Sequence, residues 1–345
     1  MKNNPNDLFL YLEGLKNLVA STNGNEKIHV GIRPYGFHAG NALAVVAYPY
    51  LLCEFYEKKY KKQPEFTFFI SINDWEQDAL DGPDYRRYPF NIYPKETSIK
   101  YLKYESANRK AISVVDYWQP SIEAALRSKL KKFSNISINF VRNSDLKSSP
   151  IFEEYLMKTI LNPLDQSQIF KKYSRMELLE KPIAYAGAIC PLCKKSHGKT
   201  NVIDIQKKII KWECSTCSTK IINPLKMFDY WWYHKPLLVA RLKIFDIDIT
   251  LSGGDHFSEG DYMIRKKMIE YFDDSIKIPR MLFTPTLLSP LNNERMSKSR
   301  NNTVYADLEK LINFARVYSG HEFRMPNEAV MNINDDEYEK YCSSL

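Results

Sequence analysis

Four of the six cysteines occur as two matched pairs, and this spacing is the strongest chemical signal in the 345-residue chain. The pairs are Cys190-Pro191-Leu192-Cys193 and Cys214-Ser215-Thr216-Cys217, with 20 residues between them. Each pair can place two thiolates on one tetrahedral ion, and an intervening hairpin would bring the pairs together. A redox motif would not need a second, matching pair. The sequence therefore predicts a zinc ribbon in which Cys190, Cys193, Cys214 and Cys217 hold a structural Zn²⁺.

A second signal is His38-Ala39-Gly40-Asn41, which follows a predicted strand and begins a predicted helix. The first N–H groups of a helix and its positive dipole end attract anions, and a histidine there can donate to phosphate oxygens. Gly40 has no side chain, so a flat base could lie against the backbone. Taken alone, the tetrapeptide is also compatible with a helix cap or a surface histidine.

The third signal is the polar stretch Arg295-Met296-Ser297-Lys298-Ser299-Arg300. Its basic and hydroxyl groups could fold over a polyphosphate and offset the charge that develops on a leaving pyrophosphate. By itself the stretch also fits a solvated basic loop. The sequence contains no Walker A or GxGxxG motif that would offer a competing nucleotide site.

The periodicity around these motifs predicts an α/β protein. A strand at Lys27–Ile32, a helix from His38 to about Lys59 and a strand at Phe66–Ile72 form the start of a βαβ unit, which implies a parallel sheet. The further predicted helices are Asp116–Lys132, Glu153–Leu161, Gln166–Leu179, Tyr230–Lys243, Glu259–Phe272 and from Tyr305 to about Tyr318, and the further strands are Ser137–Val141, Asn201–Ile205, Lys208–Glu213, Asp246–Leu251 and Arg280–Thr284. Gly253-Gly254-Asp255-His256 is predicted to be a loop.

In this order, and separated by most of the chain, the two phosphate-handling motifs resemble the HIGH (or HIGN) and KMSKS signatures of class I aminoacyl-tRNA synthetases. The resemblance is narrower around Trp231-Trp232-Tyr233-His234-Lys235-Pro236, Arg241 and Leu251-Ser252-Gly253-Gly254-Asp255-His256, which look like the region that leads to the G-x-D-H element of class I lysyl-tRNA synthetases. The cysteine pairs lie just upstream, where that family has a zinc ribbon. The similarity covers roughly residues 27–302.

The resemblance implies a Rossmann-like (HUP-type) parallel sheet that binds ATP with Mg²⁺ and activates an amino acid as an aminoacyl-adenylate. By this resemblance, His38, Gly40 and Asn41 would contact the triphosphate and adenine, and Asp255 and His256 would hold the ribose or adenine side. Lys298 would stabilise the pyrophosphate, and Met296 and Ser297 would position the loop. Gly36 and Gly254 are further candidate residues of the ATP site.

The amino-acid site is implied in the segment Asn73-Asp74-Trp75-Glu76, with Asn73, Asp74 and Glu76 as its candidate residues. A lysine ε-ammonium needs an acidic partner because that charge cannot be buried unpaired. Asp74 is the first candidate because it follows the carboxyl end of a strand, where ligands bind in open α/β sheets. The alternative is that Asp74 is a helix N-cap or turn aspartate.

Several features depart from the family pattern. One residue separates Gly36 from His38 where the family usually has two, Arg295 replaces the first lysine of KMSKS, and Arg300-Asn301-Asn302 replaces Lys-Gly-Asn. Only 43 residues follow Asn302, whereas a full lysyl enzyme continues into a helical anticodon-binding domain. Here the sequence predicts one helix and an acidic tail that would repel RNA.

The net positive charge outside the C-terminal segment is compatible with phosphate binding. The net charge is +8, but five acids and one lysine from Glu328 to Leu345 contribute −4, which leaves +12 for the remainder. Such a basic body can attract nucleotides or nucleic acid, and it can also be a solvated face. The longest apolar stretch, Ala42–Cys53, is short of the ~20 residues that span a bilayer, so we expect no membrane association. Four ligating thiolates imply a reducing, cytoplasmic compartment.

We therefore predict an α/β protein with a Rossmann-like catalytic domain and connective insertion at 1–187, a zinc ribbon at 188–223, the second half of the catalytic domain with the KMSKS-like loop at 224–304, and a C-terminal helix with an acidic tail at 305–345. The expected function is ATP-dependent activation of lysine or a related amino acid and its transfer to an acceptor that is not read by an anticodon domain. That acceptor could be a small molecule, a carrier protein or a tRNA recognised through another feature. The alternatives are a genuine lysyl-tRNA synthetase and a catalytically silent paralogue that acts as a regulator.

The sequence yields one direct prediction for Lys298. If this lysine stabilises charge on the leaving pyrophosphate, Lys298→Ala removes a contact worth ~3 kcal/mol in the transition state. Amino-acid-dependent ATP–pyrophosphate exchange should then fall by more than about tenfold. An unchanged exchange rate would show that the function of Lys298 has been misassigned.

Overall fold

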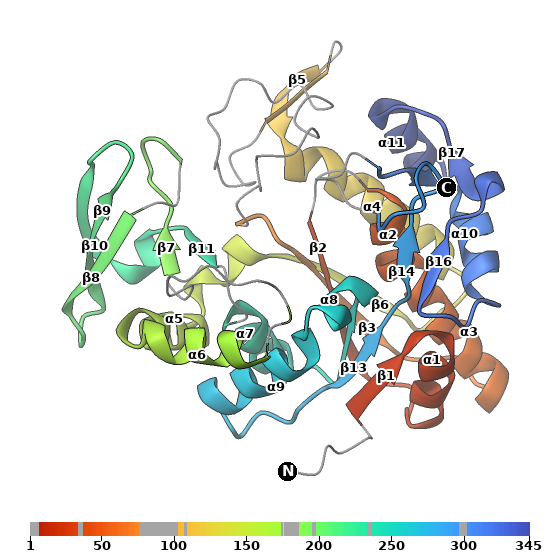
Figure 1. Cartoon of the computed structure of the whole chain (residues 1–345), viewed down its shortest axis with the longest axis horizontal. Helices are drawn as coiled ribbons and strands as arrows, with labels where there is room; N and C mark the ends of the chain where they lie inside the picture. The colour runs from red at the N-terminus through yellow and green to blue at the C-terminus, as the bar shows by residue number, and fades with distance from the viewer. Residues whose placement is uncertain are drawn as a thin grey trace.

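The computed structural model describes residues 7–33, 37–75, 103–106, 109–173, 175, 186–194, 198–232, 236–296 and 302–345. At its centre is a six-stranded sheet with the order β1-β13-β12-β2-β3-β6 (Figure 1). Every neighbouring pair in this sheet is parallel. The strands are β1 (Leu8–Leu10), β2 (Lys27–Ile32), β3 (Thr67–Ile72), β6 (Ser137–Arg142), β12 (Ile249–Ser252) and β13 (Arg280–Phe283). The predicted α/β architecture with a parallel sheet is confirmed.

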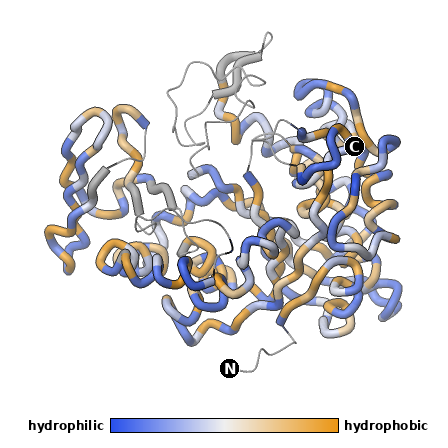
Figure 2. The backbone as a smooth tube through the Cα atoms, in the orientation of Figure 1, coloured by the Kyte–Doolittle hydropathy of each residue, from blue (hydrophilic) through white to orange (hydrophobic). Residues whose placement is uncertain are grey.

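Helices cover both faces of the sheet, which explains why its strands are nearly continuous apolar runs. Ile28, Val30 and Ile32 of β2 face a core formed with one helical layer. Phe69 of β3 points to the other layer, where its ring stacks on Phe245 with centroids 4.7 Å apart. The first layer contains α1 (Tyr11–Ala20), the helical segment that follows β2, α4 (Val114–Leu130), α10 (Leu308–Ala315) and α11 (Asp335–Ser344). The second layer contains α5 (Pro150–Leu161), α6 (Pro163–Tyr173), α7 (Pro236–Phe245) and α9 (Asp261–Phe272). Figure 2 shows hydrophobic stretches of these helices interspersed with hydrophilic ones.

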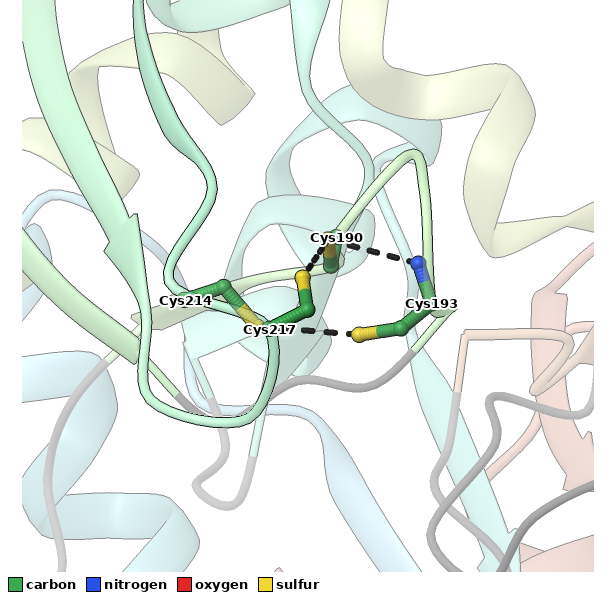
Figure 3. Close-up of side chains that lie close together, drawn as sticks. All are labelled: Cys190, Cys193, Cys214 and Cys217. Carbon is green, nitrogen blue, oxygen red and sulfur yellow. Dashed lines mark hydrogen bonds between the residues drawn. The ribbon is translucent and has the colours of Figure 1, made fainter.

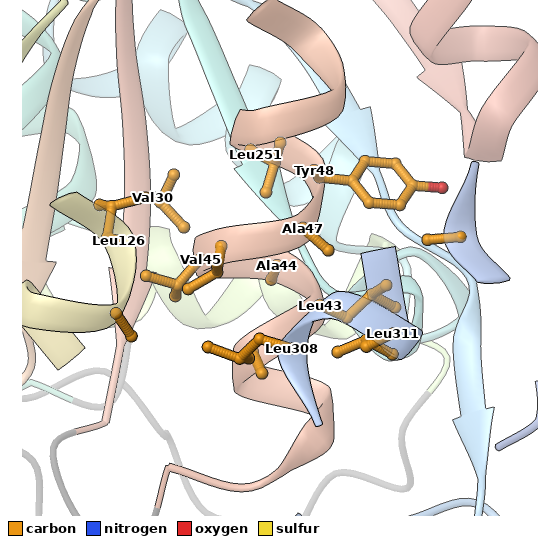
Figure 4. Packing of buried hydrophobic residues seen from close by; sticks show 14 of the residues in the cluster. Val30, Leu43, Ala44, Val45, Ala47, Tyr48, Leu126, Leu251, Leu308 and Leu311 are labelled. Carbon is orange, nitrogen blue, oxygen red and sulfur yellow. The ribbon is translucent and has the colours of Figure 1, made fainter. Parts of the chain in front are cut away.

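The helix predicted after β2 is confirmed, but it contains one widened turn. It runs as α2 (Ala39–Ala42), a π-helical turn η2 (Leu43–Ala47) and α3 (Tyr48–Tyr60). Every residue of the π-helical turn is buried. Figure 4 shows this turn among Val30 of β2, Leu126 of α4, and Leu308 and Leu311 of α10. Because π-helical turns concentrate at functional sites, its position directly after the His38 motif is notable.

Shorter strand pairs surround the core. The cysteine-rich segment forms an antiparallel sheet of three strands, β8 (Gly198–Asp204), β9 (Ile209–Cys214) and β10 (Lys220–Pro224). The remaining elements are the pairs β4 (Lys103–Ser106) with β5 (Arg109–Ser113), β7 (Ala186–Ala188) with β11 (Tyr230–Trp232), β14 (Thr286–Leu288) with β16 (Glu322–Arg324) and β15 (Tyr305–Ala306) with β17 (Val330–Met331), together with α8 (Gly254–Ser258) and the 3₁₀ turns η5 (Asn143–Ser148), η6 (Leu225–Met227) and η8 (Asn327–Ala329).

Three predicted elements differ from the structure. The helix predicted at Tyr230–Lys243 begins only at Pro236, because proline suits the first helical turn and the aromatic residues before it pair as β11 with β7. The loop predicted at residues 253–256 contains the start of the short helix α8. The predicted acidic tail is a folded segment that ends in α11, whose N-cap Asn334 forms a capping box with Glu337.

No helix in the described part of the chain combines the length and apolar character needed to cross a membrane.

Candidate active site

Two of the sequence motifs meet at the carboxyl edge of the sheet. β2 and β12 are neighbours, with His29 opposite Thr250. The chain continues from β2 to β3 on one side and from β12 to β13 on the other, so the strand order reverses between them. Open α/β sheets bind ligands at such a reversal, outside the carboxyl ends of the strands. His38 follows β2 and Gly253 follows β12, so the fold brings the two motifs to this position.

His38 is the N-cap of the helical segment that follows β2. Its backbone is extended, and its Nδ1 accepts a hydrogen bond from the Gly40 N–H at 3.1 Å. A neutral imidazole that accepts at Nδ1 carries its proton on Nε2, which is therefore a donor. A Cβ on residue 40 would lie 3.1 Å from Cε1 and 3.3 Å from Nδ1 of this ring. Glycine at this position therefore avoids a tight contact with the imidazole. Asn41 follows in the same turn, and Gly36 lies outside the described residues.

Gly254 allows helix α8 to pack against the segment that follows β13. A Cβ at this position would lie only 2.3 Å from the carbonyl oxygen of Thr284 and 2.9 Å from the backbone nitrogen of Thr286. Backbone atoms cannot move aside as a side chain can, so this approach requires glycine. The contact gives Gly254 a packing function directly beside Asp255 and His256.

An ion pair joins helix α8 to the second phosphate-handling motif. Nη2 of Arg295 lies 2.8 Å from Oδ2 of Asp255 and 3.1 Å from Oε1 of Glu259. Nδ1 of His256 lies 3.8 Å from the other oxygen of Glu259. Burial raises the pKa of the Asp255 carboxyl, but the charges of His256 and Arg295 outweigh it and the net pKa is lowered. Asp255 is therefore a carboxylate at neutral pH.

The residues beside Arg295 are held by backbone contacts. Met296 is buried, and its N–H donates to the carbonyl of Leu287 at 2.8 Å. The side-chain amide of Asn302 donates to the carbonyl of Arg295 at 3.0 Å, which joins the segment after the motif to the first residue of the motif. Ser297 and Lys298 lie outside the described residues.

The four predicted metal ligands form one cluster (Figure 3). The ligand atoms of Cys190, Cys193, Cys214 and Cys217 all lie within 4.8 Å of one another. The sulfur of Cys190 lies 3.6 Å from that of Cys217, and the sulfur of Cys193 lies 3.6 Å from that of Cys214. Thiolates bound to one zinc at ~2.3 Å in a tetrahedron would be about 3.8 Å apart. The cluster could therefore hold a zinc ion.

The two CxxC turns have matching backbones. Lys194 and Ser218, each the residue after a pair, both have positive φ, at 61° and 56°. The N–H of each donates back to the carbonyl of the first cysteine of its pair, at 2.9 and 3.0 Å. Hydrogen bonds from the side chain and backbone of Thr219 lower the pKa of the Cys217 thiol to about 6. Two equivalent turns that face each other are typical of a four-cysteine metal site.

A family model described as "tRNA synthetases class I (K)" matches residues 16–315, which is most of the chain. The chain belongs to the class I tRNA synthetases. Its matched region includes both phosphate-handling motifs and the cysteine cluster. No protein of curated function matches the sequence.

Solved structures of other class I synthetases are distantly similar. A tyrosyl-tRNA synthetase from Leishmania major in complex with tyrosinol is 12% identical with a TM-score of 0.40; the alignment covers 96% of this chain and 40% of the other. A tryptophanyl-tRNA synthetase from Campylobacter jejuni is 14% identical with a TM-score of 0.35, over 93% of this chain and 73% of the other. This synthetase chain thus spans well under half the length of the Leishmania protein.

Asp74 is buried and already bound within this class I synthetase. Only 1% of the residue is exposed. Its carboxylate accepts hydrogen bonds from the N–H of Ser144 at 3.1 Å and from the hydroxyl of Ser144 at 2.5 Å. These bonds fasten the end of β3 to the turn after β6, which favours the turn-aspartate alternative for Asp74. Glu76 lies outside the described residues.

Asn73 belongs to a buried polar network that the sequence analysis missed. Nη1 of Arg241, from α7, donates to the side-chain oxygens of Asn143 at 2.8 Å and Asn73 at 3.3 Å. In the middle of the sheet, Nε2 of His29 lies 3.0 Å from the hydroxyl of Ser71. A histidine inside an apolar strand and an arginine inside an apolar helix were the available signals, because such groups are rarely buried without partners.

The buried arginines near this network disfavour a further positive charge. Burial, followed by the charges of Arg241 and Arg265, holds the pKa of His29 well below its usual range. His29 is therefore neutral at pH 7. Arg265 itself is neutralised by Asp261, with Nε 2.6 Å from Oδ2, and also donates to the Ser252 hydroxyl at 2.8 Å.

The contact at Gly254 predicts an asymmetry between the two neighbouring glycines. In Gly254→Ala the new methyl group meets the backbone of Thr284, so we expect a loss of about 1–3 kcal/mol in the free energy of unfolding. In the control Gly253→Ala the methyl group meets only the carboxylate of Asp255, which can rotate, so the loss should be smaller. Urea denaturation of both variants checks this, and equal losses would contradict the packing function of Gly254.

Proposed function

We propose that the protein is an ATP-dependent adenylate-forming ligase that activates lysine or a related amino acid as an aminoacyl-adenylate. Membership of the class I tRNA synthetases supports the reaction class. The observation that carries the proposal is the convergence of His38 with Asp255 and His256 at the reversal between β2 and β12. The description of the family, with its K, supports lysine.

In the proposed reaction the amino-acid carboxylate attacks the α-phosphate of ATP. A bond forms between a carboxylate oxygen and phosphorus, the bond to the bridging oxygen breaks, and pyrophosphate leaves. Mg²⁺ that accompanies ATP would offset part of the charge on the phosphates. We assign His38, Gly40 and Asn41 to the triphosphate and adenine, and Asp255 and His256 to the ribose or adenine side. The Nε2–H of His38 and the helix start behind it supply a donor and a positive dipole end for a negatively charged phosphate.

Lys298 would stabilise charge on the leaving pyrophosphate. Met296 and Ser297 would position the loop that contains Lys298. Arg295 gives this loop a defined attachment, because its guanidinium binds Asp255 and Glu259. A ribose hydroxyl that binds Asp255 must share the carboxylate with Arg295 or displace it. Nucleotide binding and the position of the loop would therefore be coupled through one ion pair.

The proposed acceptor is one that is not read by an anticodon domain: a small molecule, a carrier protein, or a tRNA recognised through another feature. Residues 302–345 pack onto the catalytic core. Two alternatives have their own support. The family description favours a genuine lysyl-tRNA synthetase, and the pairing of Asp255 with Arg295 favours a silent paralogue whose ribose site is occupied internally.

One assay separates these functions. We expect ATP–pyrophosphate exchange that depends on lysine or a related amino acid when a panel of amino acids is tested with the full chain. Exchange without charging of bulk tRNA supports the proposed ligase, and exchange with charging supports the genuine synthetase. No exchange with any amino acid, from protein shown to contain zinc, would overturn the ligase and support the silent paralogue.

We also propose that the cysteine cluster binds a structural zinc. Four sulfur ligands close the coordination sphere, so the ion would stabilise the three-stranded sheet and take no part in the chemistry. Cys190, Cys214 and Trp212 are buried in one cluster with Phe152 and Leu156 of α5, so the metal would also fix the sheet to the catalytic core.

The purified protein should therefore contain about one zinc per chain, and Cys214→Ser should lose it. Cys53→Ala is the matched control, because Cys53 is equally buried but lies in the main core. Metal analysis and thermal unfolding with and without a chelator check this. Retention of zinc by Cys214→Ser, or equal loss by Cys53→Ala, would contradict the site.

A further inference from the structure

The chain after the second motif returns to the first motif and contacts the residues on both sides of His38. On one side, the N–H of Ala39 donates to the carbonyl of Val304 at 2.9 Å. Val304 lies two residues after Asn302, whose side chain donates to the carbonyl of Arg295 in the second motif. One backbone hydrogen bond thus joins the start of the helix at His38 to the segment that follows the second motif.

On the other side, Phe37 packs against the C-terminal helix. The Phe37 ring is completely buried, and its centroid lies 6.2 Å from that of Tyr338 in α11. Tyr338 is also completely buried and stacks on Tyr305, with centroids 4.3 Å apart and an angle of 19°. The Tyr338 hydroxyl donates to the carbonyl of Ala306 at 2.9 Å. Tyr338 therefore joins Phe37 to the strand that begins next to Val304.

Helix α11 is held firmly enough to serve as a support. The hydroxyl of Tyr117, in α4, donates to Oδ1 of Asp336 at 2.5 Å, and the hydroxyl of Tyr305 donates to Asp335. The N–H of Leu308 donates to the hydroxyl of Tyr341 at 3.0 Å. Several acidic residues of this segment thus have internal partners, and Figure 1 shows α11 beside α4.

We propose that α11, through the contact of Tyr338 with Phe37, positions His38 for the adenylate-forming step. The inference rests on the proposed function of His38 and adds Tyr338 as a positioning residue that itself touches no substrate. Phe37 and Ala39 are the immediate neighbours of His38, so fixing both leaves the His38 backbone little freedom. Small displacements of a catalytic group, of about 1 Å, can cost about 100-fold in rate.

The test compares Tyr338→Leu with Tyr318→Leu in the full chain. Tyr318 makes the same kind of aromatic contacts in the same segment, with Phe314 and Phe323, and its hydroxyl donates to the carbonyl of Glu322. We expect Tyr338→Leu to lower kcat of ATP–pyrophosphate exchange by about tenfold or more with little change in KM for the amino acid. Tyr338→Phe, which keeps the ring, should restore most of the rate, and Tyr318→Leu should leave it within about twofold of wild type.

A double-mutant cycle with His38→Ala distinguishes positioning from general destabilisation. If Tyr338 acts through His38, Tyr338→Leu should cost almost nothing further in the His38→Ala background. The same fold loss in both backgrounds, or an equal loss in Tyr318→Leu, would overturn the proposal. Phe37→Leu tests the same contact from the other side and serves if Tyr338→Leu does not fold; a rate like that of wild type would again overturn it.

A readout without catalysis keeps this inference separate from the proposed function. If the wild-type protein shows no exchange, the ligase proposal fails, and the position of His38 is then followed by NMR of labelled histidine rings, assigned with His38→Ala. Tyr338→Leu should shift the His38 resonances and Tyr318→Leu should not. Unchanged His38 resonances in Tyr338→Leu would reject the support by α11.

Discussion

The direct pairing of β2 with β12 places the His38 motif and the Gly253–His256 segment at the same edge of the sheet. Parallel strands must be joined by crossovers, so the segment after each of these strands departs from the same edge of the sheet. Because β3 lies on one side of this pair and β13 on the other, the two departing segments diverge and leave their helix starts facing the same region. His38 begins one of these helices and Gly253 caps the other. The rest of the protein supports this arrangement: α8 can reach its position because Gly254 permits backbone contact, and His38 keeps its place because its neighbours are packed.

The charged side chains around the site form separate groups, in each of which acids pair with an arginine. Asp255 and Glu259 hold Arg295 at the surface of the site, whereas Asp261 neutralises the buried Arg265. His29, between the buried arginines, remains neutral, because burial and the positive charges nearby both disfavour its protonated form. The side chain of the proposed lysine substrate would therefore not be stabilised near Arg241 and would need an acidic partner elsewhere. The Asp74 carboxylate is buried and bound by Ser144, so its observed contacts join the end of β3 to the turn after β6.

The sequence was sufficient to predict the features that depend on local pattern. β2 was predicted at the bounds that the structure has, and the four cysteines were identified from spacing alone. Features that depend on distant partners could not be predicted. The residues Tyr230–Trp232 were predicted as the start of a helix, and the structure pairs them as a strand with β7. The buried position of Asp74 follows from Ser144, and the ion pair of Asp255 follows from Arg295, and both partners are remote in sequence.

The acidic C-terminal segment shows why net charge alone is a weak guide to what a segment binds. Its acids suggest repulsion of RNA when they are only counted, but Asp335 accepts a hydrogen bond from the partly buried Tyr305, Asp336 accepts one from the buried Tyr117, and Glu337 caps its own helix. A carboxylate at a helix N-terminus also interacts favourably with the helix dipole. These acids therefore hold α11 in place. The segment contacts Phe37, Tyr305 and α4, so its charge carries little information about what else the protein binds.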